Sequence, residues 1–186
     1  MKGTAMAELK APITPIAHIR GAANAAVTLV EYGDYECPHC GLAHPIVKLI
    51  EKQFGKRLRF VFRHFPLAQV HPNAEAAAES AEYADAEDMF WEMHDGIYQN
   101  QDRLGLPLFF ALAGSLGLSE AGLREALVNG SFAPKVRADF LGGVRSGVNG
   151  TPTFLINGRR HDRSFDYDDP SAAIESHLTA KAAAGV

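Results

Sequence analysis

Residues 28–40 read Thr-Leu-Val-Glu-Tyr-Gly-Asp-Tyr-Glu-Cys-Pro-His-Cys, a strand-like run followed by a turn and two cysteines. Val27 to Tyr32 has the β-branched and aromatic content of a buried strand, and Gly33-Asp34 is a turn signal. Cys37-Pro38-His39-Cys40 then begins a helix, because proline is favoured in a first helical turn, where its missing N–H removes a donor that would be unpaired. Cys37 therefore lies where backbone N–H groups and the helix dipole stabilise an anion, which favours a thiolate.

The two cysteines lie three positions apart, and the chain of 186 residues has no others. A disulfide between them closes so short a loop that it restrains the unfolded chain very little, which argues against a structural staple. A Cys-x-x-Cys pair that follows a strand and begins a helix is typical of a thioredoxin-like redox pair. We expect the Cys37–Cys40 disulfide itself to be the redox group, with no bound cofactor and no metal.

Composition excludes several other classes of protein. The net charge is −4, which does not favour nucleic-acid binding, and no run of 18 apolar residues predicts a membrane span. The hydrophobic content of 47% is enough for the core of one domain with an insertion. Residues 1–10 lack the apolar core of a secretory signal, so the chain as written predicts a cytoplasmic protein. The alternative is a periplasmic protein whose signal has been removed.

The first half of the chain predicts a β-α-β unit. Residues 1–24 are expected to form an extended arm, because Pro12 and Pro15 discourage a regular helix. A helix is predicted from Pro38 to about Phe54, kinked at Pro45, with an apolar face. That face comprises Leu42, Ile46, Leu49 and Ile50. Leu58 to Phe62 alternate as a second strand, and residues 25–70 form the first half of the domain.

Residues 71–147 are predicted to be an all-helical insertion. One long helix is expected from His71 to about Gln99, with a small-residue face of alanines. That face comprises Ala74, Ala77, Ala78, Ala81 and Ala84. Three further helices are predicted at about 107–116, 119–128 and 134–146, the second capped by Ser119.

The sheet is expected to resume in residues 148–186. Thr153 to Ile156 form a strand, Asn157-Gly158 favours a type I′ hairpin, and Arg159 to about Asp162 form the returning strand. A last helix, Ser171 to Ala184, is predicted with Asp169 as its cap. The fold class is therefore α/β, with β-α-β, a helical insertion between the two halves, and then β-β-α.

This order is that of the thioredoxin fold, and the chain resembles the DsbA-like thiol:disulfide oxidoreductases. The likeness rests on the Cys-Pro-His-Cys motif, the helical insertion and Gly150-Thr151-Pro152-Thr153, and it runs from about Val27 to Leu178. It is closest to a compact bacterial branch, in which the second strand leads into a segment like Arg63-His64-Phe65-Pro66-Leu67 and then His71-Pro72.

The resemblance assigns roles to the motif. Cys37 is expected to be the exposed cysteine that forms a mixed disulfide with the substrate, and Cys40 the buried one that resolves it. Pro38 and His39 form the variable dipeptide, and in similar proteins the histidine stabilises the thiolate, which favours an oxidant over a reductant. The alternative for His39 is an exposed turn histidine without influence on the potential.

Three residues outside the motif complete the predicted site. Glu31 matches the acid that relays a proton to the second cysteine, and strand alternation makes it reachable from Cys40; the alternative is a solvent-facing glutamate. Pro152 matches the cis-proline that faces the dithiol, and its turn exposes the backbone of Thr151 to an extended substrate. Threonine at this position occurs in both oxidase-type and isomerase-type members, so it leaves the direction of electron flow open.

Several other residues are interpreted as structural. Asp34 and Glu36 are read as ordinary turn acids, and His44, His64, His71 and Trp91 as core or loop residues. The predicted partners are protein dithiol or disulfide substrates and an unidentified redox-recycling protein, with the chain a monomer or homodimer. Two alternatives are a peptide-binding domain without redox catalysis and a zinc module that uses Cys37, Cys40, His44 and one further ligand.

Overall fold

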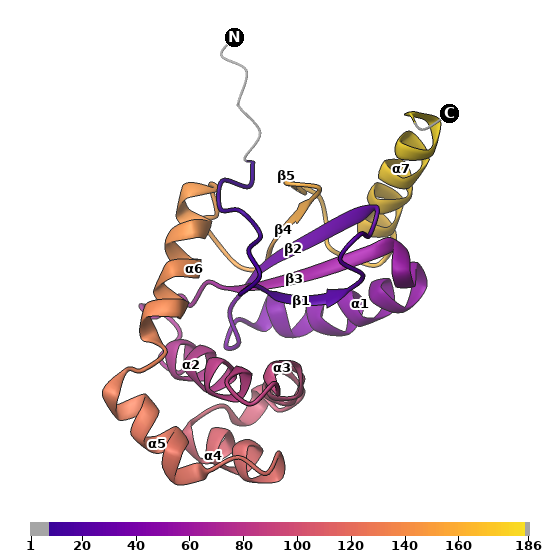
Figure 1. Ribbon diagram of the computed structural model, residues 1–186. Helices are drawn as coiled ribbons and strands as arrows, with labels where there is room; N and C mark the ends of the chain where they lie inside the picture. The colour runs from indigo at the N-terminus through magenta and orange to yellow at the C-terminus, as the bar shows by residue number, and fades with distance from the viewer. Residues whose placement is uncertain (1–7, 185–186) are drawn as a thin grey trace. The chain divides into compact units, whose positions relative to one another are not determined.

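A five-stranded sheet organises part of the chain, as shown by a computed structural model that describes residues 8–184 (Figure 1). The strand order is β1-β3-β2-β4-β5. The strands are β1 His18–Gly21, β2 Val27–Gly33, β3 Leu58–His64, β4 Thr153–Ile156 and β5 Arg159–Arg160. β1 is antiparallel to β3, β4 is antiparallel to β2, and β5 is antiparallel to β4.

The helices follow the predicted order. They are α1 Pro38–Phe54, α2 Ala74–Asp85, α3 Phe90–Gln99, α4 Leu106–Ser115, α5 Glu120–Asn129, α6 Ala133–Arg145 and α7 Asp168–Ala184, with short 3-10 turns at Gly55–Arg57 and Gln101–Arg103. The order β-α-β, helices, β-β-α confirms the predicted thioredoxin-like fold with a helical insertion. Within residues 8–184, no helix is both long enough and apolar enough to cross a membrane.

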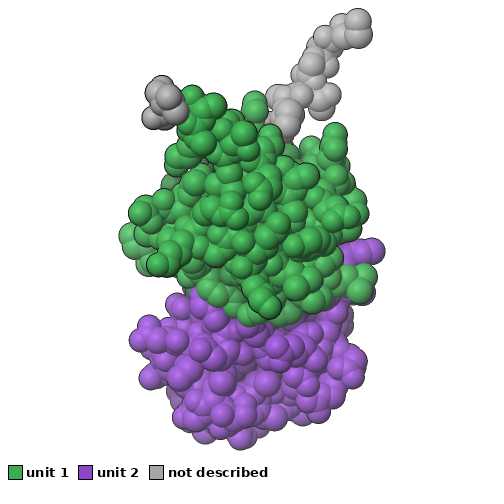
Figure 2. Space-filling model, turned by 90° about the vertical axis from the view of Figure 1, so that its right-hand side faces the viewer, with its two compact units in different colours: residues 1–32, 42–63, 142–186 green, residues 33–41, 64–141 purple. Residues whose placement is uncertain are grey.

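The chain divides into two compact units, which Figure 2 distinguishes by colour. The sheet unit comprises residues 1–32, 42–63 and 142–186, and the helical unit comprises residues 33–41 and 64–141. Residues 33–41, called here the cysteine turn, carry the Cys-Pro-His-Cys motif and group with the inserted helices. The domain boundaries predicted at 24, 70 and 147 remain a prediction, since compactness divides the chain by a different criterion.

The sheet unit differs from the prediction in its N-terminal arm. His18–Gly21 is a strand, and its residue Ile19 lies opposite Val61 of β3. The arm is therefore not wholly extended coil, because β3 offers free backbone groups that a neighbouring segment satisfies. Residues 1–7 of the predicted arm lie outside the described residues.

Helix α1 has the predicted bounds and contains Pro45, but a different face of it is buried. Leu42 and Leu49 are 69% and 53% exposed, although the sequence pattern placed them in the core. Ile50 is buried as predicted, and the other buried positions on its side of the helix are Ala43, Val47 and Phe54. The correction is one of helical phase: these four residues recur at spacings of four, three and four and therefore line one side of the helix.

The helical unit replaces the predicted long helix with two helices. Residues 86–89 separate α2 from α3, and Asp88 has a positive φ of 59°. The N–H of Met89 bonds to the carbonyl oxygen of Ala84 at 2.9 Å, which closes the end of α2 in the manner of a helix C-terminal motif. The predicted alanine face of α2 is confirmed, since all five alanines are buried.

Local signals elsewhere are mostly confirmed. The Ser119 side chain accepts a hydrogen bond from the N–H of Gly122 and caps α5. Asn157 and Gly158 have positive φ angles of 48° and 81°, as a type I′ turn requires. The cap of α7 was predicted wrongly: Asp166 Oδ1 accepts the N–H groups of Asp168 and Asp169, so the helix begins earlier than expected.

Candidate active site

The two cysteines lie at the start of α1. Cys37 is the residue before the helix, its N–H bonds to the carbonyl oxygen of Asp34 at 3.2 Å, and its carbonyl oxygen accepts the N–H of Gly41 at 3.1 Å. Cys40 is fully buried, as predicted, whereas Cys37 is only 5% exposed and not the exposed residue that the sequence suggested. Pro38 and His39 are exposed between them.

Asp34 is the centre of the cysteine turn, not an ordinary turn acid. Its carboxylate is fully buried and accepts the N–H of Glu36 at 2.8 Å and the N–H of Leu67 at 2.8 Å. The same carboxylate accepts His71 Nδ1–H at 2.7 Å. Its backbone N–H points at Cys40 Sγ, with an N···S distance of 3.4 Å. Asp34 therefore forms hydrogen bonds to Cys40 Sγ, to the backbone at Leu67 and to the His71 ring.

His71 is charged more readily than a free histidine. Burial lowers its pKa, but the hydrogen bond to Asp34 and the negative charges of Asp34, Cys37 and Glu36 together raise the pKa above its ordinary value of 6.5. Sequence reasoning had treated His71 as structural, and the correction follows from its partner. A histidine held by a buried carboxylate keeps its proton over a wider pH range than an isolated one.

Two further side chains fix the backbone of the turn. The Glu36 carboxylate accepts the backbone N–H of Asn73 at 2.6 Å and its side-chain amide at 2.9 Å, just before α2 begins. The Gln101 amide donates to the carbonyl oxygens of Tyr35 and Cys37, both at 2.8 Å. Gly41 leaves no room for a side chain, because a Cβ there would overlap this amide. The cysteine turn is thus bonded to Asn73 through Glu36 and to Gln101 through the carbonyl groups of Tyr35 and Cys37.

Tyr35 connects the turn to an aromatic cluster. Its hydroxyl shares a hydrogen bond of 2.9 Å with His94 Nδ1. The His94 ring lies edge-on to Trp91 and Tyr98, with centroid distances of 5.2 and 5.1 Å. His64 is structural, as predicted: it is buried, and its Nε2 bonds to Glu82 Oε1 at 2.8 Å.

The remaining predicted residues belong to the sheet unit. Glu31 is buried in β2, opposite Phe154 of β4, so it is not an edge residue facing solvent. The Thr151–Pro152 peptide bond is cis, and the next residue, Thr153, lies opposite Tyr32 of β2. Glu31 therefore lies on β2, and the loop that contains Pro152 leads directly into the neighbouring strand β4. The structure thus brings these residues together in one unit and the four motif residues together in the other.

Sequence reasoning missed five residues that hold the turn, which are Asp34, Glu36, His71, Asn73 and Gln101. One signal was readable. An aspartate two residues before a free N–H is typical of an Asx turn, and Asp34 stands two before Glu36. The other contacts join residues 33 to 66 positions apart, and no local pattern indicates them.

Residues 14–176 match a protein-family model described as Thioredoxin. Curated relatives named Na⁺/H⁺ antiporter NhaA 1 from Salinispora arenicola and NhaA 3 from Salinispora tropica are 43% and 41% identical over 170 residues. The match covers 91% of this chain but 26% of each relative, so the chain spans about a quarter of their length.

Solved structures extend the comparison to three dimensions. Oxidised BdbD from Bacillus subtilis has a TM-score of 0.79 and 28% identity, with 87% of this chain and 92% of BdbD covered. Alpha-DsbA1 from Wolbachia pipientis shares the fold, with a TM-score of 0.79, 20% identity and coverage of 91% and 95%. By the family match, the chain belongs to the thioredoxin family, and its fold is similar to that of BdbD and alpha-DsbA1.

Proposed function

We propose that this protein exchanges a Cys37–Cys40 disulfide with the dithiols of client proteins, more as an oxidant than as a reductant. The observation that carries the proposal is the position of Cys37 immediately before α1, with Cys40 in the first turn of the helix. Free backbone N–H groups at that end stabilise a thiolate on Cys37, which is the reactive form in exchange. Stabilising the thiolate favours the reduced pair and therefore makes the disulfide a stronger oxidant.

The exchange takes two steps in the oxidising direction. A client thiolate attacks Cys37 Sγ, the Cys37–Cys40 bond breaks, and Cys40 leaves as a thiolate. A second client thiolate then attacks the client sulfur of the mixed disulfide, and Cys37 leaves as a thiolate. Two electrons pass from the client to the pair, and the two protons of the client thiols are released to solvent or to the reduced cysteines. In the reverse direction, Cys40 attacks and resolves the mixed disulfide.

Residues of the turn have distinct roles in these steps. The N–H of Asp34, directed at Cys40 Sγ, supports the departure of Cys40 as a thiolate. The charge on His71 interacts favourably with a thiolate on Cys37, because the same pairwise attraction raises the pKa of the histidine. His39 is exposed within the motif and is assigned the same function as in the resemblance. His71 is therefore a positive group that favours a thiolate on Cys37.

The sheet unit contributes the remaining proposed roles. Buried Glu31 is assigned the proton relay to Cys40, and the backbone of Thr151 before Pro152 is assigned the pairing with an extended client. These roles rest on the resemblance. The burial of Glu31 and its position beside the strand that follows Pro152 support them.

Partners and location follow from the direction of exchange. Protein dithiols are the proposed clients, and a separate redox protein regenerates the disulfide. An oxidant needs an oxidising compartment, as in the periplasmic alternative, whereas a cytoplasmic location would keep the pair reduced. Monomer or homodimer remains a prediction. The antiporter names belong to relatives that are about four times longer, and we propose no ion transport for this segment.

Two experiments test the proposal: a measurement of the redox potential of the Cys37–Cys40 pair, and the trapping of the mixed disulfide between Cys37 and a client. Titration in glutathione buffers with thiol counting is expected to give a potential nearer to about −120 mV than to about −270 mV. Incubation of a Cys40→Ala variant with an oxidised client is expected to trap a covalent complex at Cys37, whereas Cys37→Ala traps none. A pair without a reversible two-electron couple would contradict the proposal. In that case zinc content becomes the next measurement, although within residues 8–184 no cluster of three metal-ligating side chains contains either cysteine.

A further inference from the structure

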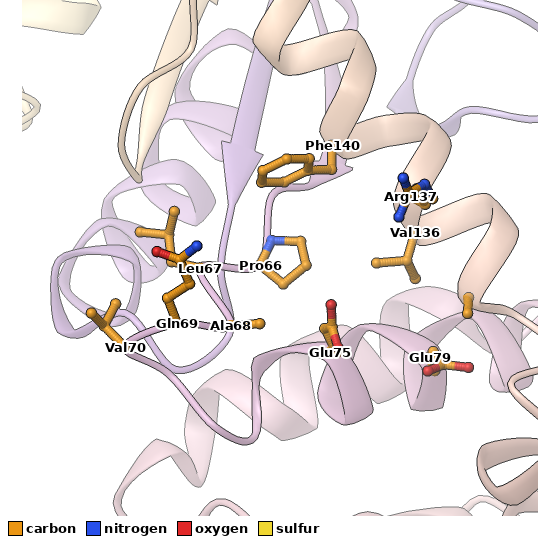
Figure 3. A pocket seen from close by; sticks show the side chains of 11 residues that line it. Pro66, Leu67, Ala68, Gln69, Val70, Glu75, Glu79, Val136, Arg137 and Phe140 are labelled. Atoms are coloured by element: carbon orange, nitrogen blue, oxygen red, sulfur yellow. The ribbon is translucent and has the colours of Figure 1, made fainter.

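A groove of about 610 Å³ lies within the helical unit, between the segment after β3 and helices α2 and α6 (Figure 3). Residues 66–70 form one wall, and Val136 and Phe140 of α6 form another. Phe140 stacks on Phe65 with ring centroids 4.4 Å apart, which fixes this wall in place. Val70 is 69% exposed at the rim. The groove is therefore preformed, largely apolar and within the usual size of ligand sites, about 300–1,000 Å³.

Two carboxylates of α2, Glu75 and Glu79, line the groove one helical turn apart. The backbone N–H groups of Phe132 and Ala133 bond to the Glu79 carboxylate, yet its Oε2 is buried and has no hydrogen-bond partner among the described atoms. Burial, with a smaller contribution from the charge of Glu75, raises the pKa of Glu79 above its ordinary value of 4.5. A cationic donor placed in the groove would satisfy that oxygen and relieve the repulsion.

The charges of the lining favour a basic ligand. Arg137 of α6 also lines the groove, and no ion pair joins it to either glutamate among the described residues. Two carboxylates and one guanidinium leave an excess of negative charge beside the apolar wall. A segment with an apolar side chain next to a lysine or arginine matches both properties, whereas an acidic segment would meet like charge.

Hydrogen bonds connect the wall of the groove to the cysteine turn. Leu67, in its wall, donates its N–H to the Asp34 carboxylate, and His71, just past the wall, bonds to the same oxygen. The backbone of Asp34 in turn bonds to the N–H of Cys37. A chain that lies in the groove is therefore close to the turn at which exchange takes place. The wall and the turn share one buried carboxylate, so they are held in a fixed relation.

From these contacts we propose that the groove is a docking site for an extended segment of the client polypeptide, with an apolar residue against Val136 and Phe140 and an adjacent lysine or arginine at Glu79. The proposal rests on the proposed function, because it assigns a binding surface for the client of the exchange reaction. It predicts a preference for clients whose cysteine is near an apolar and basic pair.

Binding can be tested without any thiol in the ligand. The probe is a blocked, cysteine-free peptide, Gly-Leu-Lys-Leu-Gly, compared with a counterpart in which glutamate replaces the lysine; amide NMR shifts report binding to the full chain. The lysine peptide is expected to shift Leu67, Val70 and Val136, and to bind about tenfold more tightly than the glutamate peptide. Equal affinities, or shifts confined to other residues, would overturn the proposal.

Variants with matched controls sharpen this test. Val70→Asp is expected to weaken binding of the lysine peptide about tenfold, and Glu79→Gln to remove its advantage over the glutamate peptide. The controls are Val128→Asp and Glu125→Gln on α5, since Val128 is 81% exposed and neither residue lines the groove. Both controls are expected to bind like the wild type. A control that loses as much binding as its groove counterpart would contradict the assignment.

Kinetics separate this proposal from the function on which it rests. The ratio of the exchange rate with a cysteine-containing lysine peptide to that with dithiothreitol is expected to fall in Val70→Asp and not in Val128→Asp. Exchange with both thiols but no groove binding would overturn the docking site and leave the function intact. Groove binding without exchange with either thiol would do the reverse.

Discussion

The cysteine turn and the loop before Pro152 both belong to the proposed site, but they are held in different ways. Groups 33 to 66 positions later in the chain bond to the cysteine turn, among them the backbone N–H of Leu67 and the side chains of His71 and Gln101. Hydrogen bonds of residues 147–150, called here the proline turn, come from neighbours: Arg160 donates to the Gly147 carbonyl oxygen, and Thr153 Oγ1 to that of Gly150.

The conformation of the cysteine turn therefore depends on the helical insertion, whereas the conformation of the proline turn depends on residues close to it in the sequence. The helical unit brings a histidine, an asparagine and a glutamine to the cysteine turn, where each forms a hydrogen bond. The proline turn relies on strands β4 and β5 next to it. Substitutions in the insertion should therefore change the redox pair, whereas substitutions beside the proline turn should not.

Replacement of Asp34 offers the largest test of this contrast. Asp34→Ala removes the acceptor of two backbone N–H groups and of His71 in a fully buried position, so we expect a loss of about 3 kcal/mol or more in the free energy of unfolding. Urea denaturation measures it. The exposed Asp102→Ala is the control and should lose less than about 0.5 kcal/mol. Equal losses in the two variants would show that the turn does not depend on this carboxylate.

Gln101→Ala should give a smaller loss of about 1–2 kcal/mol, because two buried carbonyl oxygens lose a donor. Its second effect is on reactivity: the carbonyl oxygen of Cys37 keeps only the N–H of Gly41 as a donor, and the rate of alkylation of Cys37 by iodoacetamide should change. The control is Gln99→Ala at the exposed end of α3. The comparison fails if Gln99→Ala alters the alkylation rate as much as Gln101→Ala.

The pH dependence of the potential tests His71. An imidazolium favours the reduced pair with a Cys37 thiolate, so His71→Asn should lower the potential by about 30 mV, a tenfold change in the equilibrium constant. Because the pKa of His71 is raised above 6.5, the difference is fully present below pH 6.5 and disappears as the pH rises through the raised value. His177→Asn, on α7, is the control. A difference that grows with pH would contradict the sign of this interaction.

Arg160→Ala should give the smallest effect. The Arg160 guanidinium bonds to Gly147 and Asn149 and pairs with exposed Asp162, and such contacts at a surface contribute about 0.5 kcal/mol or less. Thermal unfolding measures the loss. A destabilisation as large as that of Gln101→Ala would show that the proline turn is not held as locally as the hydrogen bonds indicate.

Features set by neighbouring residues were predictable from the sequence. The motif at the start of α1, the Asn157-Gly158 turn and the Ser119 cap each follow from residue type at fixed short spacing, and all three are present. The thioredoxin-like order of strands and helices followed from these signals, because strands, turns and helix starts each have a local sequence signature. The roles assigned to Glu31 and Thr151 came from the resemblance to a known family and not from a local pattern.

Features that depend on distant partners were not predictable. Asp34 looked like a turn acid because its partners Leu67 and His71 lie more than 30 positions later. Strand β1 forms because β3 is beside it, which the prolines of the arm do not indicate. Helices α2 and α3 are separated at Asp88, which has a left-handed backbone conformation, and residues 86–89 contain no glycine or proline that would indicate a break. The wrong face of α1 was an error of phase in a helix with apolar residues on two sides.

The contact between His94 and Trp91 gives the protein an intrinsic optical probe. Trp91 is the single tryptophan of the chain, its ring lies 5.2 Å from that of His94, and His94 is bonded to the hydroxyl of Tyr35, two residues before Cys37. A nearby imidazole quenches indole emission according to its charge and distance. Oxidation and reduction of the pair should therefore be visible as a change in native fluorescence, without a label and in real time.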